Sequence, residues 1–383
     1  MPASNQELID RARALIPAIR ARAAQTESLR QIHADTLREL VDAELIQMLV
    51  PKRWGGSESD LPTMLEVVDA ISSACVSTGW ITAFYISHNT YVAKFSARAQ
   101  DEMFGARGYV LMPGANAPTM TARQVEGGWR LSGRAAWGSG IMHADWVLVS
   151  GTTDDGFRTF VLPVADVQVD DVWHFTGMAG TGSNDIVIDD AFVPEYRTLR
   201  REEFIGGTTT GAALHGNPLY TIPLMPVAYC TILPVVTGGI SGALGEYQRM
   251  VERRVRNFSG AVARDQQHAH VVLGDLQIRT RIARDQARLV FERTDAILRT
   301  RRFTSADRLD LKAQVAWISQ HCRSLVNDMM ANAGASSFHL DQPLQRYWRD
   351  LNTTCSHAFW DWDTTRELVG RQHLGLPVKH PLL

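Results

Sequence analysis

The sequence has few cysteines and no long uninterrupted apolar run. Its four cysteines, Cys75, Cys230, Cys322 and Cys355, form no CxxC pair and no His/Cys cluster at zinc spacing. We therefore expect reduced, mostly buried thiols and no metal site. The longest apolar region, Ile222–Val236, contains three prolines and is too short and too broken to span a bilayer.

A surplus of charge of either sign is also missing. The net charge is −2, so nothing in the charge balance indicates nucleic acid or an anionic membrane as a partner. The first fifteen residues are charged and helical in pattern and do not resemble a signal peptide, and we expect a cytoplasmic protein. With 383 residues, 45% of them apolar, the chain can form two or three domains of an ordinary globular protein.

Hydrophobic periodicity divides the chain into parts. Residues 1–108 have helical periodicity and are predicted to form an N-terminal α-helical domain. Residues 109–205 contain short β-rich runs between glycine turns, which predicts a small antiparallel barrel or sandwich. We expect strands at Tyr109–Met112 and Val167–Trp173, among others.

A linker and a helical region follow. Residues 206–225 are predicted to be a linker, and the Gly- and Thr-rich loop Gly206–Asn217 within it is the natural lid over a substrate. Residues 226–383 return to helical periodicity and predict an antiparallel four-helix bundle. The four predicted helices are Val227–Asn257, Ala263–Thr300, Ser305–Asn332 and Pro343–Val369. The expected fold class is mainly α with a central β-domain.

The stretch Trp137–Trp146 stands out in the β-rich part. Two glycines and Ser139 lie between two tryptophans, with a predicted strand on either side. Such a turn brings backbone N–H groups and a hydroxyl close to a flat ligand, beside an aromatic wall. A glycine-rich hairpin closed by two core tryptophans is the alternative, and on spacing alone it is the commoner of the two.

The order of the domains, together with four motifs, resembles the acyl-CoA dehydrogenase fold. The motifs are Trp137-Gly-Ser-Gly followed by Ala-Asp-Trp146, Gly180–Pro194, Arg256–Gly260 and Gly334–Asp350. Ala358 stands where a typical member has its catalytic glutamate, and His357 precedes it. That departure is similar to one subgroup, the group D flavin-dependent monooxygenases, which share the His-Ala-Asp-Trp and Arg-x-Trp-Arg-Asp motifs.

The resemblance implies the oxygenase component of a two-component system. Such a protein takes reduced FMN or FAD (FMNH2 or FADH2) from a separate NAD(P)H:flavin reductase, with O2 as co-substrate. It inserts one oxygen atom into a small aromatic or polycyclic substrate through a C4a-(hydro)peroxyflavin. Gly334–Phe338 departs from the glycine pattern that accompanies an adenine end, which favours FMN. Relatives imply a homotetramer, or at least a dimer, with the β-domain between the first domain and the bundle.

The resemblance also implies site residues. The expected flavin contacts are Ser139 at N5, Trp137 against the isoalloxazine, Gly140, Ser183 in a flavin-contacting turn, Arg256 at a phosphate across a subunit interface, Phe258 and Gly334. His357 is the leading catalytic candidate, because an imidazole can take a proton from a phenol and stabilise the peroxide. Ser139 and His88 are further catalytic candidates. His88, Trp80, Asn116 and His357 are expected to line the substrate pocket. His143 is expected to make a structural hydrogen bond.

Structural explanations and other functions stay open at this point. Each candidate has an ordinary alternative: a turn serine, a core tryptophan, a solvated arginine or a buried histidine. An acyl-CoA dehydrogenase with a displaced base is a second hypothesis, and it would purify yellow with tightly bound oxidised FAD. A helical binding protein on a retired flavoenzyme scaffold is a third, and a complete lack of flavin binding would favour it.

Overall fold

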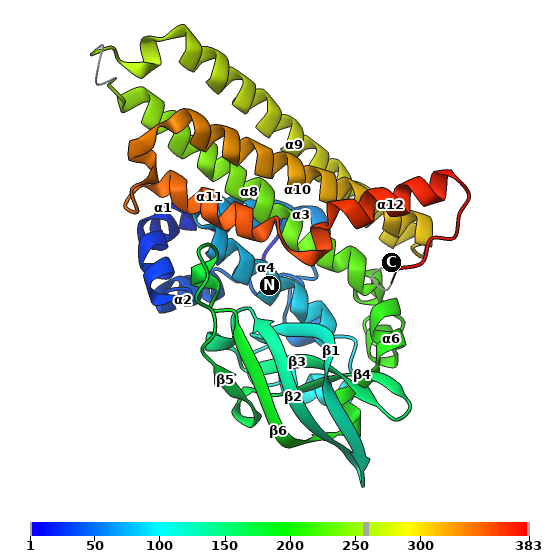
Figure 1. Ribbon diagram of the computed structural model, residues 1–383. Helices are drawn as coiled ribbons and strands as arrows, with labels where there is room; N and C mark the ends of the chain where they lie inside the picture. Colours follow the sequence, from blue (N-terminus) through cyan, green and yellow to red (C-terminus); the bar gives the residue numbers. More distant parts are fainter. Residues whose placement is uncertain (1, 256–259, 381–383) are drawn as a thin grey trace.

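The computed structural model describes residues 2–255 and 260–380 of the chain, which folds into helices, a sheet and further helices (Figure 1). The N-terminal helices are α1 (Asn5–Leu29), α2 (Ala34–Asp42), α3 (Leu61–Ala74), α4 (Val76–Val92) and α5 (Ala97–Phe104). Asp60 caps α3 by accepting from the backbone N–H of Thr63, and Pro62 lies in the first turn, as the sequence predicts. In α4 every residue except Phe84 is buried, so this helix is covered on all sides.

Seven strands form one sheet. They are β1 (Gly114–Val125), β2 (Gly128–Gly138), β3 (Trp146–Thr153), β4 (Gly156–Pro163), β5 (Gln168–Asp170), β6 (Asn184–Pro194) and β7 (Thr198–Arg200). The spatial order is β5-β6-β2-β1-β3-β4-β7, and β1 and β3 run parallel while the other pairs are antiparallel. Because β1 separates β2 from β3, the stretch Trp137–Trp146 crosses over β1. The hairpin alternative for this stretch is therefore wrong.

Two predicted strands differ from the structure. Tyr109–Met112 is not a strand, because side chains rather than a neighbouring strand accept from its N–H groups at Val110 and Leu111. Asn89 Oδ1 accepts from the N–H of Val110 at 2.9 Å, and Asp145 Oδ2 accepts from the N–H of Leu111 at 3.1 Å. Of the predicted strand Val167–Trp173, only the three residues of β5 pair with a neighbour.

Short helices lie within and on either side of the predicted lid loop Gly206–Asn217. They are α6 (Arg201–Gly206), α7 (Thr210–Ala213) and the 3-10 turn η6 (Pro218–Thr221). Thr209 caps α7 and also donates to the backbone oxygen of Lys94 at 2.6 Å, so the segment packs on the end of α4. A Cβ on Gly211 would collide with the backbone oxygen of Phe95, so only glycine fits this contact. A role as a lid stays a prediction.

The C-terminal helices are α8 (Leu224–Arg253), α9 (Gln267–Thr300), α10 (Ser305–Ala333), α11 (Pro343–Thr354) and α12 (Trp362–His373). The prediction of one helix over Pro343–Val369 is wrong, because α11 ends at Thr354 and α12 begins at Trp362. Two side chains cap new starts inside that interval: His357 caps the turn η9 (Ala358–Trp360) and Asp361 caps α12. Helix α8 is long and apolar enough to cross a membrane, but 94% of its most apolar window is buried inside the protein.

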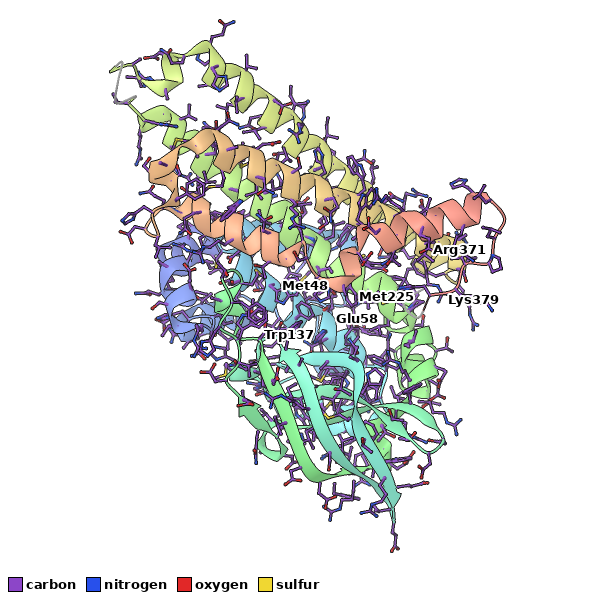
Figure 2. All side chains as sticks on the ribbon, in the orientation of Figure 1. Met48, Glu58, Trp137, Met225, Arg371 and Lys379 are labelled. Carbon is purple, nitrogen blue, oxygen red and sulfur yellow. The ribbon has the colours of Figure 1, made fainter. Side chains whose placement is uncertain are left out.

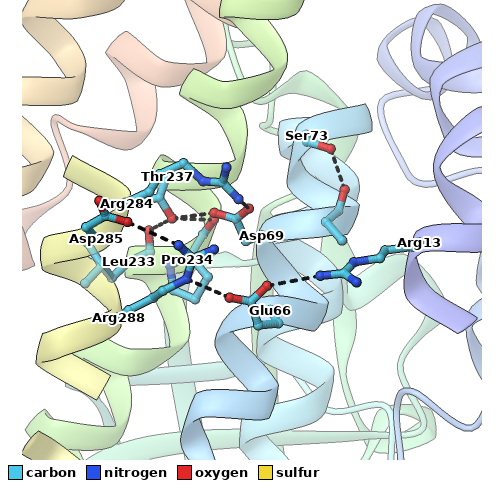
Figure 3. A network of polar contacts seen from close by, with 11 residues as sticks. Arg13, Glu66, Asp69, Ser73, Leu233, Pro234, Thr237, Arg284, Asp285 and Arg288 are labelled. Atoms are coloured by element: carbon cyan, nitrogen blue, oxygen red, sulfur yellow. Dashed lines mark hydrogen bonds and ion pairs between the residues drawn. The ribbon is translucent and has the colours of Figure 1, made fainter. Parts of the chain in front are cut away.

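The N-terminal helices pack directly on the bundle, and the sheet lies to one side of both (Figure 1). The expected sandwich around the β-domain is therefore wrong: α3 and α4 are largely buried, and both pack directly on α8. A polar network seals this contact (Figure 3). Asp69 on α3 accepts from Arg284 on α9 at 2.6 Å and from Thr237 on α8 at 2.8 Å.

Candidate active site

An exposed tryptophan in a strained conformation marks the end of β2. Trp137 has a φ of 65°, at a shift in the β2–β6 register, and its N–H donates to Asp185 Oδ1 at 3.2 Å. Bulky residues in the left-handed region cost energy and occur where function requires them. Its side chain is 56% exposed, where the sheet meets the helices (Figure 2), so it is not the core tryptophan of the structural alternative.

Two further rings extend this aromatic wall. Trp173 and Phe175 stack with ring centroids 3.9 Å apart, and the Trp137 ring stands edge-on to both, at 6.0 and 5.8 Å. Phe175 is 41% exposed, so part of this apolar wall is open to a ligand. A flat aromatic ligand is the partner that such a wall suits.

A chain of side-chain hydrogen bonds ends at Ser139, in the crossover that follows β2. Trp80 Nε1 on α4 donates to Ser139 Oγ at 3.1 Å. Ser139 Oγ lies 2.8 Å from Ser183 Oγ, which lies 2.6 Å from Thr181 Oγ1. Thr181 Oγ1 donates to the backbone oxygen of Met178 at 2.8 Å. The chain joins two segments that lie more than forty positions apart in the sequence.

The carbonyl oxygen of Met178, at the opposite end of this hydrogen-bonded chain from Ser139, fixes which group donates in every hydrogen bond. A carbonyl oxygen can only accept, so the one hydroxyl proton of Thr181 is used at Met178. Ser183 must then donate to Thr181, and Ser139 must donate to Ser183. Ser139 has no second proton, and one of its lone pairs accepts from Trp80. What Ser139 offers to a ligand is therefore an acceptor.

Gly140 fixes the backbone beside Ser139. Its N–H donates to the backbone oxygen of Thr181 at 3.0 Å, and its C=O accepts from the hydroxyl of Tyr85 at 2.5 Å. Its φ is 83°, and a Cβ would lie 2.8 Å from the Tyr85 oxygen, so the position requires glycine. Both backbone groups are occupied within the protein, and contact of Gly140 with a cofactor stays a prediction.

His357 lies in the break between α11 and α12. Its Nδ1 accepts from the N–H of Phe359 at 3.2 Å, so in the neutral ring the proton is on Nε2. Burial lowers the pKa of His357 to about 4, which keeps the ring neutral at pH 7. The ring lies 5.8 Å from that of Trp80. In this arrangement the neutral imidazole presents Nε2–H as a hydrogen-bond donor, and its catalytic role stays a prediction.

His88 has the opposite polarity. It is 1% exposed on α4, and its Nδ1 lies 2.7 Å from the backbone oxygen of Met112. Nδ1 must carry the proton to make that bond, which leaves Nε2 as the acceptor. Burial lowers the pKa of His88 to about 4. The rings of Trp80, Phe84 and His88 follow one another along α4 at 4.9 and 5.0 Å, so a donor, His357, and an acceptor, His88, flank one aromatic pair.

Comparisons with known proteins agree with this geometry. The acyl-CoA dehydrogenase N-terminal domain model matches residues 3–106 and the C-terminal domain model matches residues 230–362. The structure of the 3-HSA hydroxylase from Rhodococcus sp. RHA1 superimposes with a TM-score of 0.92 at 30% identity, covering 98% of this chain and 99% of that one. XiaF from Streptomyces sp., solved with FADH2 and glycerol, gives 0.91 at 27% identity, covering 99% and 98%.

Full-length relatives decide the family. A pigment production hydroxylase from Rhodococcus sp. is 38% identical over 100% of both chains. The flavin-dependent monooxygenase oxygenase subunit HsaA of Rhodococcus jostii is 32% identical over 95% of this chain and 97% of its own. The chain belongs to the flavin-dependent monooxygenases of the acyl-CoA dehydrogenase fold. The mainly α fold with a central sheet and the predicted monooxygenase class are confirmed.

Residues of the two motifs that are specific to the subgroup support the active site through contacts with backbone atoms of other segments. Asp350 on α11 accepts from the N–H of Met178 at 2.6 Å, so the bundle holds the turn that carries Thr181 and Ser183. Burial raises the pKa of Asp350 to about 7. His143 Nε2 lies 3.0 Å from the backbone oxygen of Ile32, in agreement with the structural role expected of it.

The remaining predicted residues of the monooxygenase are more scattered. Asn116 on β1 has a buried Oδ1 without a hydrogen-bond partner among the described residues, and its backbone oxygen accepts from Arg201 at 2.6 Å. Gly334 ends α10 with a φ of 81° and packs on the guanidinium of Arg254, away from the hydroxyl chain within the described contacts. Arg256 and Phe258 lie outside the described residues. The substrate contact of Asn116 and the cofactor contacts of Gly334, Arg256 and Phe258 stay predictions.

Sequence reasoning missed several residues that shape the site. Thr181 directs the hydroxyl chain, Tyr85 holds Gly140, and Phe359 orients His357. Thr181 lies between two glycines of a motif that was noticed, so its hydroxyl was the one available signal. Tyr85 acts on the backbone of a residue far away in the sequence, and Phe359 acts through its own backbone N–H, which almost any residue could supply. A single sequence therefore carries no signal for either.

Proposed function

We propose that this monooxygenase is the oxygenase component of a two-component aromatic hydroxylase, supplied with reduced flavin by a separate NAD(P)H:flavin reductase. The observation that carries the proposal is the acceptor at Ser139. N5 of a reduced flavin bears a hydrogen, whereas N5 of an oxidised flavin is an acceptor. A site that offers an acceptor therefore favours the reduced form, which must arrive already reduced from elsewhere.

Other residues fit the remainder of a flavin ring. Trp137, Trp173 and Phe175 would cover the isoalloxazine, and Ser183 would keep Ser139 in its orientation. When bound, the reduced flavin would supply the electrons that activate O2. The protein's part is to hold the ring, keep water away and direct protons. FMN is the form proposed here, since Gly334–Phe338 lacks the glycines that accompany an adenine end.

The two histidines favour a phenolic substrate. His88 Nε2 would accept a hydrogen bond from the substrate's hydroxyl, and His357 Nε2–H would donate to an oxygen on the other side of the Trp80–Phe84 pair. Phe84 is the one residue of α4 that is not buried, which suits a wall of the substrate pocket. An aromatic ring with at least one hydroxyl meets all of these requirements.

We also propose a homotetramer in the cytoplasm. Helix α9 presents Val271, Ile278, Ile282 and Leu289, which are 64, 54, 45 and 48% exposed and follow a helical stripe. A hollow of about 500 Å³ between α9, α10 and α12 continues this apolar surface. A second copy of the chain would cover both. Light scattering should give a tetramer, and Ile278→Glu should yield smaller species.

An anaerobic binding experiment tests the flavin proposal. The protein is titrated with reduced FMN and reduced FAD, and separately with the oxidised forms. The reduced form should bind more tightly, with purified protein nearly colourless. With a reductase and phenolic substrates, product should then exceed hydrogen peroxide. Tighter binding of oxidised FAD, with reduction by an acyl-CoA, would instead establish the dehydrogenase hypothesis.

A further inference from the structure

Lys312 is a buried lysine that neither the family motifs nor the proposed chemistry uses. It lies on α10 and is 1% exposed. Its Nζ donates to the backbone oxygen of Phe359 at 3.3 Å and lies 5.9 Å from the centroid of the Tyr229 ring. Burial lowers the pKa of Lys312, and the nearby carboxylate of Asp361 opposes that effect. Burying an ammonium group is costly unless the group meets a specific need.

The break between α11 and α12 contains a backbone group that requires a buried donor. Phe359 belongs to the short turn η9, whose carbonyl groups cannot all find partners within so short a helix. Lys312 satisfies the carbonyl of Phe359, while the N–H of Phe359 donates to His357 Nδ1. One residue is thus held at both ends, by α10 and by the histidine.

Aromatic packing supports the same residue. The ring of Phe359 stands edge-on to that of His357, with centroids 4.6 Å apart, and edge-on to that of Tyr229, at 6.2 Å. The Tyr229 hydroxyl is buried without a hydrogen-bond partner among the described residues, so it does not compete for the carbonyl of Phe359. Within the described contacts, Lys312 is the group that satisfies this carbonyl.

We propose that Lys312 is a positioning residue for His357. By holding the carbonyl of Phe359, it keeps the N–H of Phe359 on Nδ1, so that Nε2 carries the proton. The inference rests on the proposed function in one respect: the proposed function supplies the substrate to which the Nε2–H of His357 donates. The link from Lys312 to the imidazole can be measured without flavin or substrate.

The first measurement is chemical modification of His357 in the flavin-free protein. Diethyl pyrocarbonate reacts at a ring nitrogen with a free lone pair, and the one lone pair of neutral His357 is occupied by the N–H of Phe359. Lys312→Met should free this lone pair and raise the carbethoxylation rate of the His357 peptide by roughly two- to tenfold, which corresponds to the free energy of one hydrogen bond. Lys312→Gln, whose amide can still donate, should stay near the wild-type rate.

Lys94→Met is the matched control. Lys94 is also fully buried, and it donates to the backbone oxygen of Ile222 at 2.7 Å, which lies on a different segment from His357 and Phe359. Its loss should leave carbethoxylation of His357 unchanged. An equal rate in folded Lys312→Met and wild type overturns the proposal. If the Met variant does not fold, a large acceleration in Lys312→Gln overturns it and a wild-type rate upholds it.

A second measurement separates this proposal from the proposed function. In turnover, Lys312→Met should lower the ratio of product to hydrogen peroxide, and it should add nothing when His357 is already alanine. An undiminished effect in the His357→Ala background means that Lys312 acts elsewhere, and the positioning role fails. Full activity of His357→Ala alone would refute the catalytic part of the proposed function, while the modification rates would still decide the role of Lys312.

Discussion

Removing one hydroxyl should shift the flavin preference of the site from the reduced toward the oxidised form. Thr181 is 2% exposed, and valine has nearly its shape without the hydroxyl. In Thr181→Val the proton of Ser183 loses its acceptor and turns to Ser139, whose own proton then points outward. Ser139 changes from an acceptor to a donor, which suits N5 of an oxidised flavin and opposes the N5–H of a reduced one.

The size of the effect follows from hydrogen-bond energies. A neutral hydrogen bond contributes about 0.5–1.5 kcal/mol net, and the substitution costs one bond to reduced flavin while adding one to oxidised flavin. The ratio of the two dissociation constants should therefore change by about 5- to 150-fold. The fold should tolerate the change, because the Met178 oxygen keeps its bonds from Trp173 Nε1 at 2.8 Å and from the N–H of residue 181 at 3.1 Å.

The assay is a pair of equilibrium titrations, one with oxidised FMN and one with chemically reduced FMN under anaerobic conditions. Thr294→Val is the control, because Thr294 is also buried and donates to a backbone carbonyl, that of Val290, but belongs to α9. A ratio that stays within twofold of wild type in a folded Thr181→Val protein would refute the ordered chain of protons.

Three further predictions concern buried titratable groups. Asp350→Asn keeps an acceptor for the N–H of Met178. Because burial raises the pKa of Asp350 to about 7, the wild-type protein loses stability as the pH rises from 4 through 7. In urea unfolding, the variant should therefore exceed wild type by up to about 4 kcal/mol at pH 8 and by little at pH 4. Asp69→Ala should lower the free energy of unfolding by about 1.5–3 kcal/mol, because Arg284 loses a charged partner; an unchanged midpoint would contradict this. Burial lowers the pKa of His88 to about 4, so the stability that the neutral ring contributes is present above pH 6.5 and is lost as the pH falls toward 4. His88→Gln should therefore flatten the acid limb of a thermal-unfolding profile.

Local signals in the sequence predicted much of the fold, and tertiary contacts account for what they missed. The α3 start followed from Asp60 and Pro62, which act on their own helix. The break after Thr354 did not follow, because the apolar spacing continues through it and the interruption comes from capping by His357 and Asp361. Both residues also occur inside helices, so their capping role is visible only in the structure.

The active site shows the same contrast between residues predicted from local motifs and residues that act through tertiary contacts. Ser139 and Ser183 were each predicted from the register of a motif, and the structure places their oxygens 2.8 Å apart. Lys312 and Asp350 escaped notice as parts of the site, because each acts through the backbone of a residue on another segment. The polarity of His357 depends on a single N–H, and no spacing rule in one sequence can reveal it.

The hydroxyl chain has a consequence for the life of the molecule in a cell. Trp80 comes from the N-terminal helices, Ser139 and Ser183 from around the sheet, and Asp350 from almost the last helix to leave the ribosome. A chain that is unfinished or partly unfolded lacks one of these supports, so its Ser139 has no fixed polarity. We expect such a chain to lack the preference for reduced flavin. That preference is therefore a property of the completely folded protein.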